Sequence, residues 1–166
     1  MMVNFAGDYG AKVTALNPLV YWRLGDGDKS DGATAVNLGS LDASGDGTYR
    51  DVVGHVADVI YGPDTAGSFG TTIAGGTTGD RVELDFGSVA TPYPSSQLTY
   101  SIWMRSSQAG TVGIIAYGTN AAGANQAILF SNGSVLQLYI NGLSVNTGWT
   151  HAQLFDGTWK LSLIHI

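Results

Sequence analysis

Three aspartates, Asp26, Asp28 and Asp31, stand close together in the glycine-rich stretch 26–32, which reads DGDKSDG. Calcium selects hard oxygen ligands on a flexible turn, and carboxylates at steps of two and three supply them. The stretch is not an EF-hand loop, because the terminal Glu is missing and Lys29 interrupts the acidic pattern. We therefore predict calcium as a cofactor at these three aspartates, with a solvated turn as the alternative.

Two tyrosines with neighbouring asparagines are candidates for sugar binding, which needs an exposed aromatic surface beside a few polar groups. Tyr117 with Asn120 and Asn125 borders a soft segment, and Tyr139 with Asn141 lies at an expected hairpin. These five residues are the predicted ligand-binding site, and structural tyrosines are the alternative.

Two tryptophans are assigned to strands instead. Trp22 is expected in the core. Trp103 alternates against Tyr100 and Ile102, and it is expected in the core or on a second, partly exposed face.

The carboxylates of Glu83 and Asp85 raise the possibility of glycoside hydrolysis. Some jelly-roll glucanases carry a second Glu two or three positions after the Asp, which puts nucleophile and acid/base on one strand face, ~5–5.5 Å apart for retention. Here those positions hold Gly87 and Ser88, and Glu83 is the only Glu in the chain. We therefore predict no enzyme, with a glycoside hydrolase as the least favoured alternative and a polar strand face as the role of Glu83 and Asp85.

Further catalytic and metal signatures are missing from the sequence. His55, His151 and His165 are scattered, and neither a nucleophile elbow nor a phosphate loop occurs. The chain has no Cys, which excludes disulfides and thiolate metal sites.

The composition restricts the partners and the fold class. Charged residues make up 12%, about half of the roughly 25% in average domains, and Gly accounts for 24 of 166 residues. The net charge is −6 with only seven Lys and Arg, which argues against nucleic acid and anionic membranes. No apolar run approaches the ~18 residues of a membrane span. Asp and Gly favour turns, so a helix-rich protein is not expected.

Short stretches that alternate between apolar and polar residues indicate half-buried strands. The clearest are Leu19–Leu24, Arg81–Phe86 and Leu98–Met104. Together with the other β-rich runs they predict about ten strands, and therefore an all-β antiparallel β-sandwich, a jelly roll. The other runs are Thr48–Val53, Val59–Tyr61, Val112–Tyr117, Ile128–Phe130, Val135–Ile140, Trp149–Phe155 and Trp159–Ile164.

Two Asn-Gly pairs predict consecutive hairpins. Asn132-Gly133 and Asn141-Gly142 each follow an apolar run, and type I′ turns need positive φ at both central positions. We expect three antiparallel strands in chain order, with Asn132-Gly133-Ser134 acting as a turn and not as a glycosylation site. The only helix expected is a turn or two at residues 11–16, with Asp8 as its cap.

The sequence resembles a known domain family from residue 15 to about residue 160. Residues 17–26, NPLVYWRLGD, resemble the opening of laminin-G-like, concanavalin A-like jelly-roll domains found in phage tail and other virion proteins. Residues 32–37 and 45–49 resemble the next two motifs, with Asn37 in place of the usual Asp. Further matches follow in the same order at residues 79–86, 98–104, 149–152 and 156–158.

The resemblance implies a function at a surface. It implies a non-catalytic carbohydrate-binding or adhesive module of a phage tail or virion surface protein, often assisted by calcium. The expected location is the virion or the extracellular space, and residues 1–5 show no signal peptide. The expected partners are cell-surface or extracellular glycans and other virion subunits. The alternative is a structural decoration or assembly module without a glycan ligand.

The sequence divides into an N-terminal segment 1–16, a laminin-G-like sandwich 17–160 and a tail 161–166. The tail, LSLIHI, is also the in-frame translation of CTGTCTCTTATACACATC, a transposon-end adapter used for sequencing libraries. We therefore predict that residues 161–166 are non-native and that the jelly roll lacks its last strands, with a genuine β-strand as the alternative.

Overall fold

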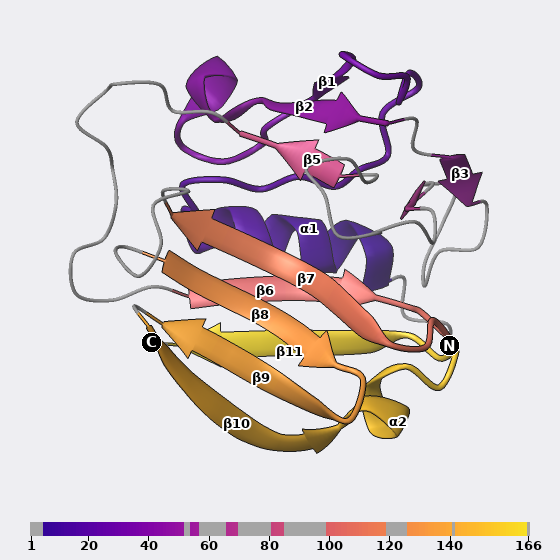
Figure 1. The fold of residues 1–166 in the computed structure, drawn as a ribbon. Helices are drawn as coiled ribbons and strands as arrows, with labels where there is room; N and C mark the ends of the chain where they lie inside the picture. Colours follow the sequence, from indigo (N-terminus) through magenta and orange to yellow (C-terminus); the bar gives the residue numbers. More distant parts are fainter. Residues whose placement is uncertain are drawn as a thin grey trace. The chain divides into compact units, whose positions relative to one another are not determined.

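The computed structural model describes residues 5–51, 54–56, 66–69, 81–84, 99–118, 126–140 and 142–165. Its contacts divide the chain into two compact units, Met1–Pro92 (unit 1) and Tyr93–Ile166 (unit 2). Short antiparallel strands dominate, which confirms the all-β class (Figure 1). Among the described residues, no helix is long and apolar enough to cross a membrane. The expected single sandwich over residues 17–160 stays a prediction.

Unit 1 contains a helix and two small sheets, with strand orders β1-β2-β5 and β3-β4. The helix begins six residues earlier than expected and includes Asp8, so the prediction that Asp8 caps it was wrong. The predicted strand Val59–Tyr61 lies outside the described residues. The elements are α1 (Phe5–Ala15), β1 (Thr34–Ala35), the 3-10 helix η1 (Asp42–Gly45), β2 (Gly47–Arg50), β3 (Gly54–Val56), β4 (Ala66–Ser68) and β5 (Arg81–Glu83).

The segment Leu19–Leu24 is not the strand that its alternation predicted. Only Trp22 pairs, in an isolated bridge with Asn37. The amide of Tyr21 donates to the Asn37 side chain and not to a strand, and Leu24 turns into the left-handed region with φ 57°. Side-chain hydrogen bonds therefore replace a strand ladder here, which alternation alone cannot reveal.

The side chain of Asn37, which is 7% exposed, organises this loop region. Its Oδ1 accepts from the amides of Tyr21 (2.8 Å) and Gly39 (2.9 Å). Its Nδ2 donates to the carbonyl of Asp42 (2.9 Å) and lies 3.4–3.5 Å from the carbonyls of Gly39 and Leu19. An Asp could accept the two amides but could not donate to these carbonyls, so the observed network uses both ends of the Asn37 amide.

Trp22 belongs to the core of unit 1, as predicted. It packs against the buried pair Ala35 and Tyr49, and its Nε1 donates to the carbonyl of Gly45 at 2.9 Å. A Cβ on Gly47 would collide with Val82 and approach the Trp22 ring to 3.0 Å. Close packing thus explains both glycines of this motif: Gly47, the first residue of β2, lies against Val82 and the indole, and Gly45 lies against Asn37.

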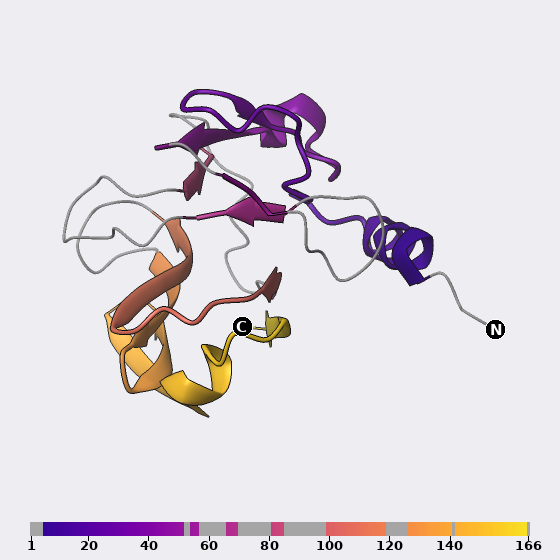
Figure 2. The ribbon, with the colours of Figure 1, turned by 90° about the vertical axis from the view of Figure 1, so that its right-hand side faces the viewer.

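Unit 2 contains a four-stranded antiparallel sheet in the order β10-β9-β8-β7 and a two-stranded sheet β11-β6. Both views place β6 and β11 on one side of the larger sheet (Figures 1 and 2). The elements are β6 (Thr99–Met104), β7 (Thr111–Gly118), β8 (Gln126–Asn132), β9 (Val135–Ile140), β10 (Leu143–Thr150), α2 (His151–Leu154) and β11 (Lys160–His165).

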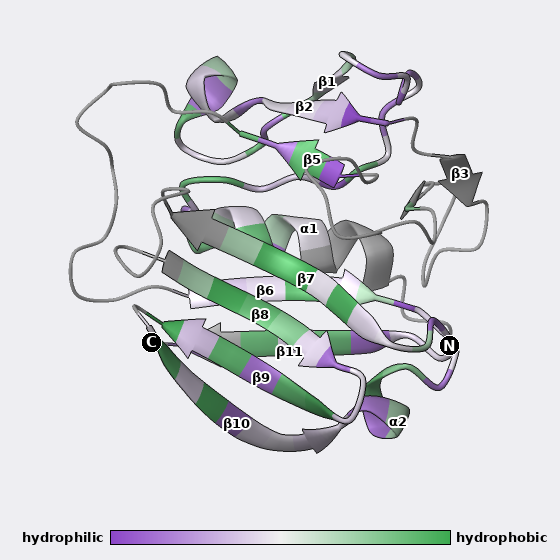
Figure 3. Ribbon diagram, in the orientation of Figure 1, coloured by the Kyte–Doolittle hydropathy of each residue, from purple (hydrophilic) through white to green (hydrophobic). Residues whose placement is uncertain are grey.

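The core of unit 2 lies on the face of the larger sheet that carries Val112, Leu129 and Leu136. Leu154 and Phe155 pack into this cluster, and Met104 contacts it from β6. Bands of opposite hydropathy along β9 mark the two faces of the strand (Figure 3). Buried Leu136 and Leu138 alternate with half-buried Gln137 and Tyr139, so the predicted strand Val135–Ile140 is confirmed and has one core-facing side.

The predicted meander is confirmed as β8, β9 and β10, but its first turn differs from expectation. The register pairs Ser131 with Leu136, which leaves Gly133 and Ser134 as the loop residues. Only Gly133 has positive φ (87°), so the turn is not the predicted type I′. Asn132 instead accepts from the amides of Ser134 and Val135, both at 3.0 Å. In the second turn, Gly142 has φ 89°.

The predicted strand Trp149–Phe155 was wrong beyond Thr150, because α2 begins at His151. Thr150 and Gln153 form a capping box that starts this helix. The capping-box pattern, a Thr followed three residues later by a Gln, is visible in the sequence at Thr150 and Gln153. Residues 160–165 form β11 and pair with all of β6, from Lys160 opposite Met104 to His165 opposite Thr99.

Candidate functional site

The three predicted calcium ligands each bind a different partner. Asp28 Oδ1 accepts from the Ser30 amide (2.9 Å) and hydroxyl (2.7 Å), and Asp31 Oδ1 accepts from the amide of Asp51 (3.2 Å). Asp26 Oδ2 accepts from the hydroxyl of the buried Tyr49 at 2.7 Å. Burial raises the pKa of Tyr49, and the hydrogen bond to Asp26 adds to this. The Asp26–Tyr49 bond ties the loop to β2, and the Asp31 bond ties it to the residue that follows β2.

Lys29 places its own positive charge inside this loop. The residue is 2% exposed, and its Nζ donates to the carbonyl of Asp26 at 2.6 Å. Burial lowers the pKa of Lys29, which the charge of Asp26 partly opposes. Within the described part of the chain, no group of three His, Asp or Glu side chains gathers as metal ligands. The three aspartates do not form such a group, and calcium binding stays a prediction.

Calcium binding has a direct thermal test. An ion that binds the folded loop alone would raise Tm by mass action. If the loop rearranges to bind calcium, Tm will be higher in millimolar calcium than in excess chelator. The substitution Asp28→Asn should then abolish this difference in Tm. Equal melting curves with calcium and with chelator would show that the folded chain does not bind calcium.

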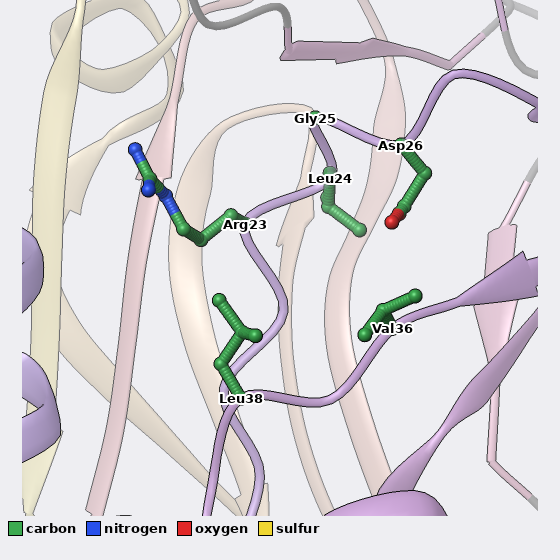
Figure 4. A pocket seen from close by; sticks show the side chains of 6 residues that line it. All are labelled: Arg23, Leu24, Gly25, Asp26, Val36 and Leu38. Atoms are coloured by element: carbon green, nitrogen blue, oxygen red, sulfur yellow. The ribbon is translucent and has the colours of Figure 1, made fainter.

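A shallow pocket of about 270 Å³ opens beside the same loop (Figure 4). Leu24, Val36 and Asp26 face its interior, whereas the side chain of Arg23 points away from Asp26. Its volume falls below the roughly 300–1,000 Å³ of ligand pockets. The residues that line it, Arg23, Leu24, Gly25, Asp26, Val36 and Leu38, include no aromatic platform for a sugar.

The structure locates only part of the predicted sugar site. Asn120, Asn125 and Asn141 lie outside the described residues. Tyr117 lies on β7 at the register position opposite the buried Ala127, and Tyr139 lies on β9 opposite Ile128. Because neighbouring strand positions belong to opposite faces, the register does not bring the two tyrosine positions to one face.

Tyr139 belongs to a face that the sequence alone did not assemble. On the side of the sheet opposite the core, Tyr139 stands between Ile128 and Ser144. In the next row, Gln137 stands between Phe130 and Asn146. Phe130, Gln137 and Tyr139 are half-buried, and the hydroxyl of Tyr139 reaches toward Gly142. We call this the outer face: Ile128, Phe130, Gln137, Tyr139, Ser144 and Asn146.

The strands that build the outer face, β8–β10, carry no carboxylate, ammonium, guanidinium or imidazole group. Residues 106–150 contain no Asp, Glu, Lys, Arg or His, and twelve of the thirteen acidic residues lie in residues 1–92. The face therefore combines two aromatic rings with amides and a hydroxyl in a neutral setting. This charge-free run, together with the register of the two hairpins, is the signal that would have found the site.

Two groups that resemble catalytic residues have structural roles. The Ser131 hydroxyl lies 2.6 Å from His151 Nδ1, but Ser131 is fully buried, and His151 Nε2 binds the carbonyl of Gln108 at 2.8 Å. Glu83 pairs with Arg50 and Arg81 at 2.9 and 3.5 Å. Neither group offers an accessible nucleophile or a carboxylate pair.

No family model, no curated protein and no solved structure matches this chain.

Proposed function

We propose that this chain is a non-catalytic carbohydrate-binding or adhesive module, built as a laminin-G-like jelly roll and located on a phage tail or another virion surface. The observation that carries the proposal is the outer face of the larger sheet. There, Tyr139 and Phe130 lie in adjacent rows beside Gln137, Ser144 and Asn146.

The chemistry of this face suits an uncharged glycan. Aromatic rings stack on the apolar face of a sugar, and amides donate and accept hydrogen bonds with its hydroxyls. No charge is present in residues 106–150 to attract an ionic ligand. We therefore expect binding that changes little with salt, because screening weakens only interactions between charges.

The test is attachment to a dense array of neutral glycans, because shallow single sites gain affinity through multivalency. We expect Tyr139→Ala and Phe130→Ala each to weaken attachment about tenfold, which corresponds to roughly 1.4 kcal/mol of lost contact. Tyr117→Ala belongs in the same series because the sequence predicted that tyrosine. Trp149→Ala is the matched control. Trp149 is an exposed aromatic residue of β10, 54% accessible, that does not belong to the outer face.

Normal melting curves are required of every variant before attachment is compared. If Tyr139→Ala and Phe130→Ala attach like the parent chain while both melt normally, the outer face is not the glycan site. If the parent chain binds no neutral glycan, the structural alternative, a decoration or assembly module, takes its place.

A further inference from the structure

Strand β10 is an edge of the larger sheet with an unusually open surface. It has eight residues and pairs only with β9 among the described strands. Seven of the eight are exposed, including Leu143 at 72% and Val145 at 51%. The backbone groups on its free side can be satisfied by water or by another strand.

The usual devices that block strand addition are largely missing from this edge. Natural edge strands carry Lys, Pro or bulges. Leu143–Thr150 contains neither a charged residue nor a proline. The register irregularity between Asn146 and Thr150 affects only the second half, so Leu143–Asn146 keeps regular pairing with β9.

We propose that β10 pairs with β10 of a second copy of this chain, antiparallel about a two-fold axis at Val145. Side chains alternate between the two faces along each strand. In a sheet that continues from one copy to the next, odd-numbered residues of β10 must therefore stand opposite odd-numbered ones, and even-numbered opposite even-numbered ones. With Val145 on the axis, Val145 faces Val145 of the second copy and Ser144 faces its Asn146. The two Val145 side chains then meet on the core side, flanked by Leu143 opposite Thr147, and hydroxyl meets amide on the outer face.

The absence of charge favours a second copy over a charged partner. Residues 1–92 contain twelve acidic and five basic residues, so contacts between two copies through this part of the chain would bring like charges together. Residues 106–150 are the longest stretch that avoids this cost. Closed two-fold dimers are also the commonest association of identical chains. The proposal does not depend on glycan binding.

The experiment is sedimentation equilibrium over a range of concentrations. We expect the parent chain to dimerise with a Kd of about 10 μM, typical of a small interface. Val145→Lys and Val145→Asp should each weaken dimerisation at least about tenfold, because like charges would stand directly opposite at the axis. A mixture of the two variants should form heterodimers, because the opposed charges then attract.

The control is Leu163→Lys, which adds the same charge at a residue of β11 that is 67% exposed. It should dimerise like the parent chain. A parent chain that stays monomeric to about 1 mM overturns the proposal. It is also overturned if the two Val145 variants fail to pair in the mixture while both melt normally, or if Leu163→Lys alone abolishes association.

Discussion

Asn37→Asp is expected to lower the free energy of unfolding by about 3–5 kcal/mol, the range for an uncompensated charge in a buried polar network. The substitution changes one amide nitrogen into a carboxylate oxygen. That oxygen would face the carbonyl of Asp42 at the 2.9 Å now bridged by a hydrogen bond, with the carbonyls of Gly39 and Leu19 close by. The chain loses donors and gains repulsion in a site that is 7% exposed.

Urea unfolding at neutral pH measures this loss. Asn132→Asp, the same change at an exposed residue outside β10, is the control and should cost well under 1 kcal/mol, because a carboxylate can accept the same two hydrogen bonds. The surrounding carbonyls would raise the pKa of the new carboxyl group in the folded chain. Folding then favours its protonated form, so the deficit should shrink as pH falls through that raised pKa. A loss below about 1 kcal/mol at pH 7 would show that the Asn37 amide is not essential.

Deletion of residues 161–166 is expected to make the chain aggregate. Strand β6 pairs with β11 through six registered residues, and no other described strand pairs with it. The deletion would leave Thr99–Met104 with two open edges beside the already exposed Trp103 (39%). Such an apolar strand recruits other chains.

Light scattering during a temperature ramp compares the deletion with two full-length variants. Leu163→Ser retains the strand but removes an exposed apolar side chain, so it should scatter less than the parent chain. His165→Ala removes only a 2.8 Å contact with the Thr99 hydroxyl and should behave like the parent. If the deleted chain scatters no more than the parent, then β11 is dispensable, as expected of an appended tail.

The meander was predictable because two local signals agreed. Apolar, β-prone runs indicated the strands around Ile128 and Val135–Ile140, and Asn-Gly pairs indicated the turns. Local patterns failed where side chains bind the backbone. The Asn37 side chain accepts a hydrogen bond from the amide of Tyr21, which lies sixteen residues earlier in the chain. The alternation of apolar and polar residues over Leu19–Leu24 does not indicate this hydrogen bond.

The candidate site was predictable one residue at a time but not as a surface. Tyr139 was identified because it precedes a turn, whereas Phe130, Gln137 and Asn146 join it only through the register of two hairpins. A shift of one residue would move every one of these side chains to the other face. The first turn uses Gly133-Ser134 rather than the expected Asn132-Gly133, so the loop itself was placed one residue too early.

The distribution of charge also determines which protease can report on which part of the molecule. Trypsin cleaves after Lys and Arg, and between Arg105 and Lys160 the chain contains neither. The four strands β7–β10 and helix α2 therefore remain within one tryptic peptide even when they are fully unfolded. Tryptic cleavage at the sites from Lys12 to Arg81 follows the opening of unit 1, whereas chymotryptic cleavage at Phe130, Tyr139 or Trp149 follows the opening of the larger sheet. The two enzymes used in parallel would reveal whether units 1 and 2 unfold together or in sequence.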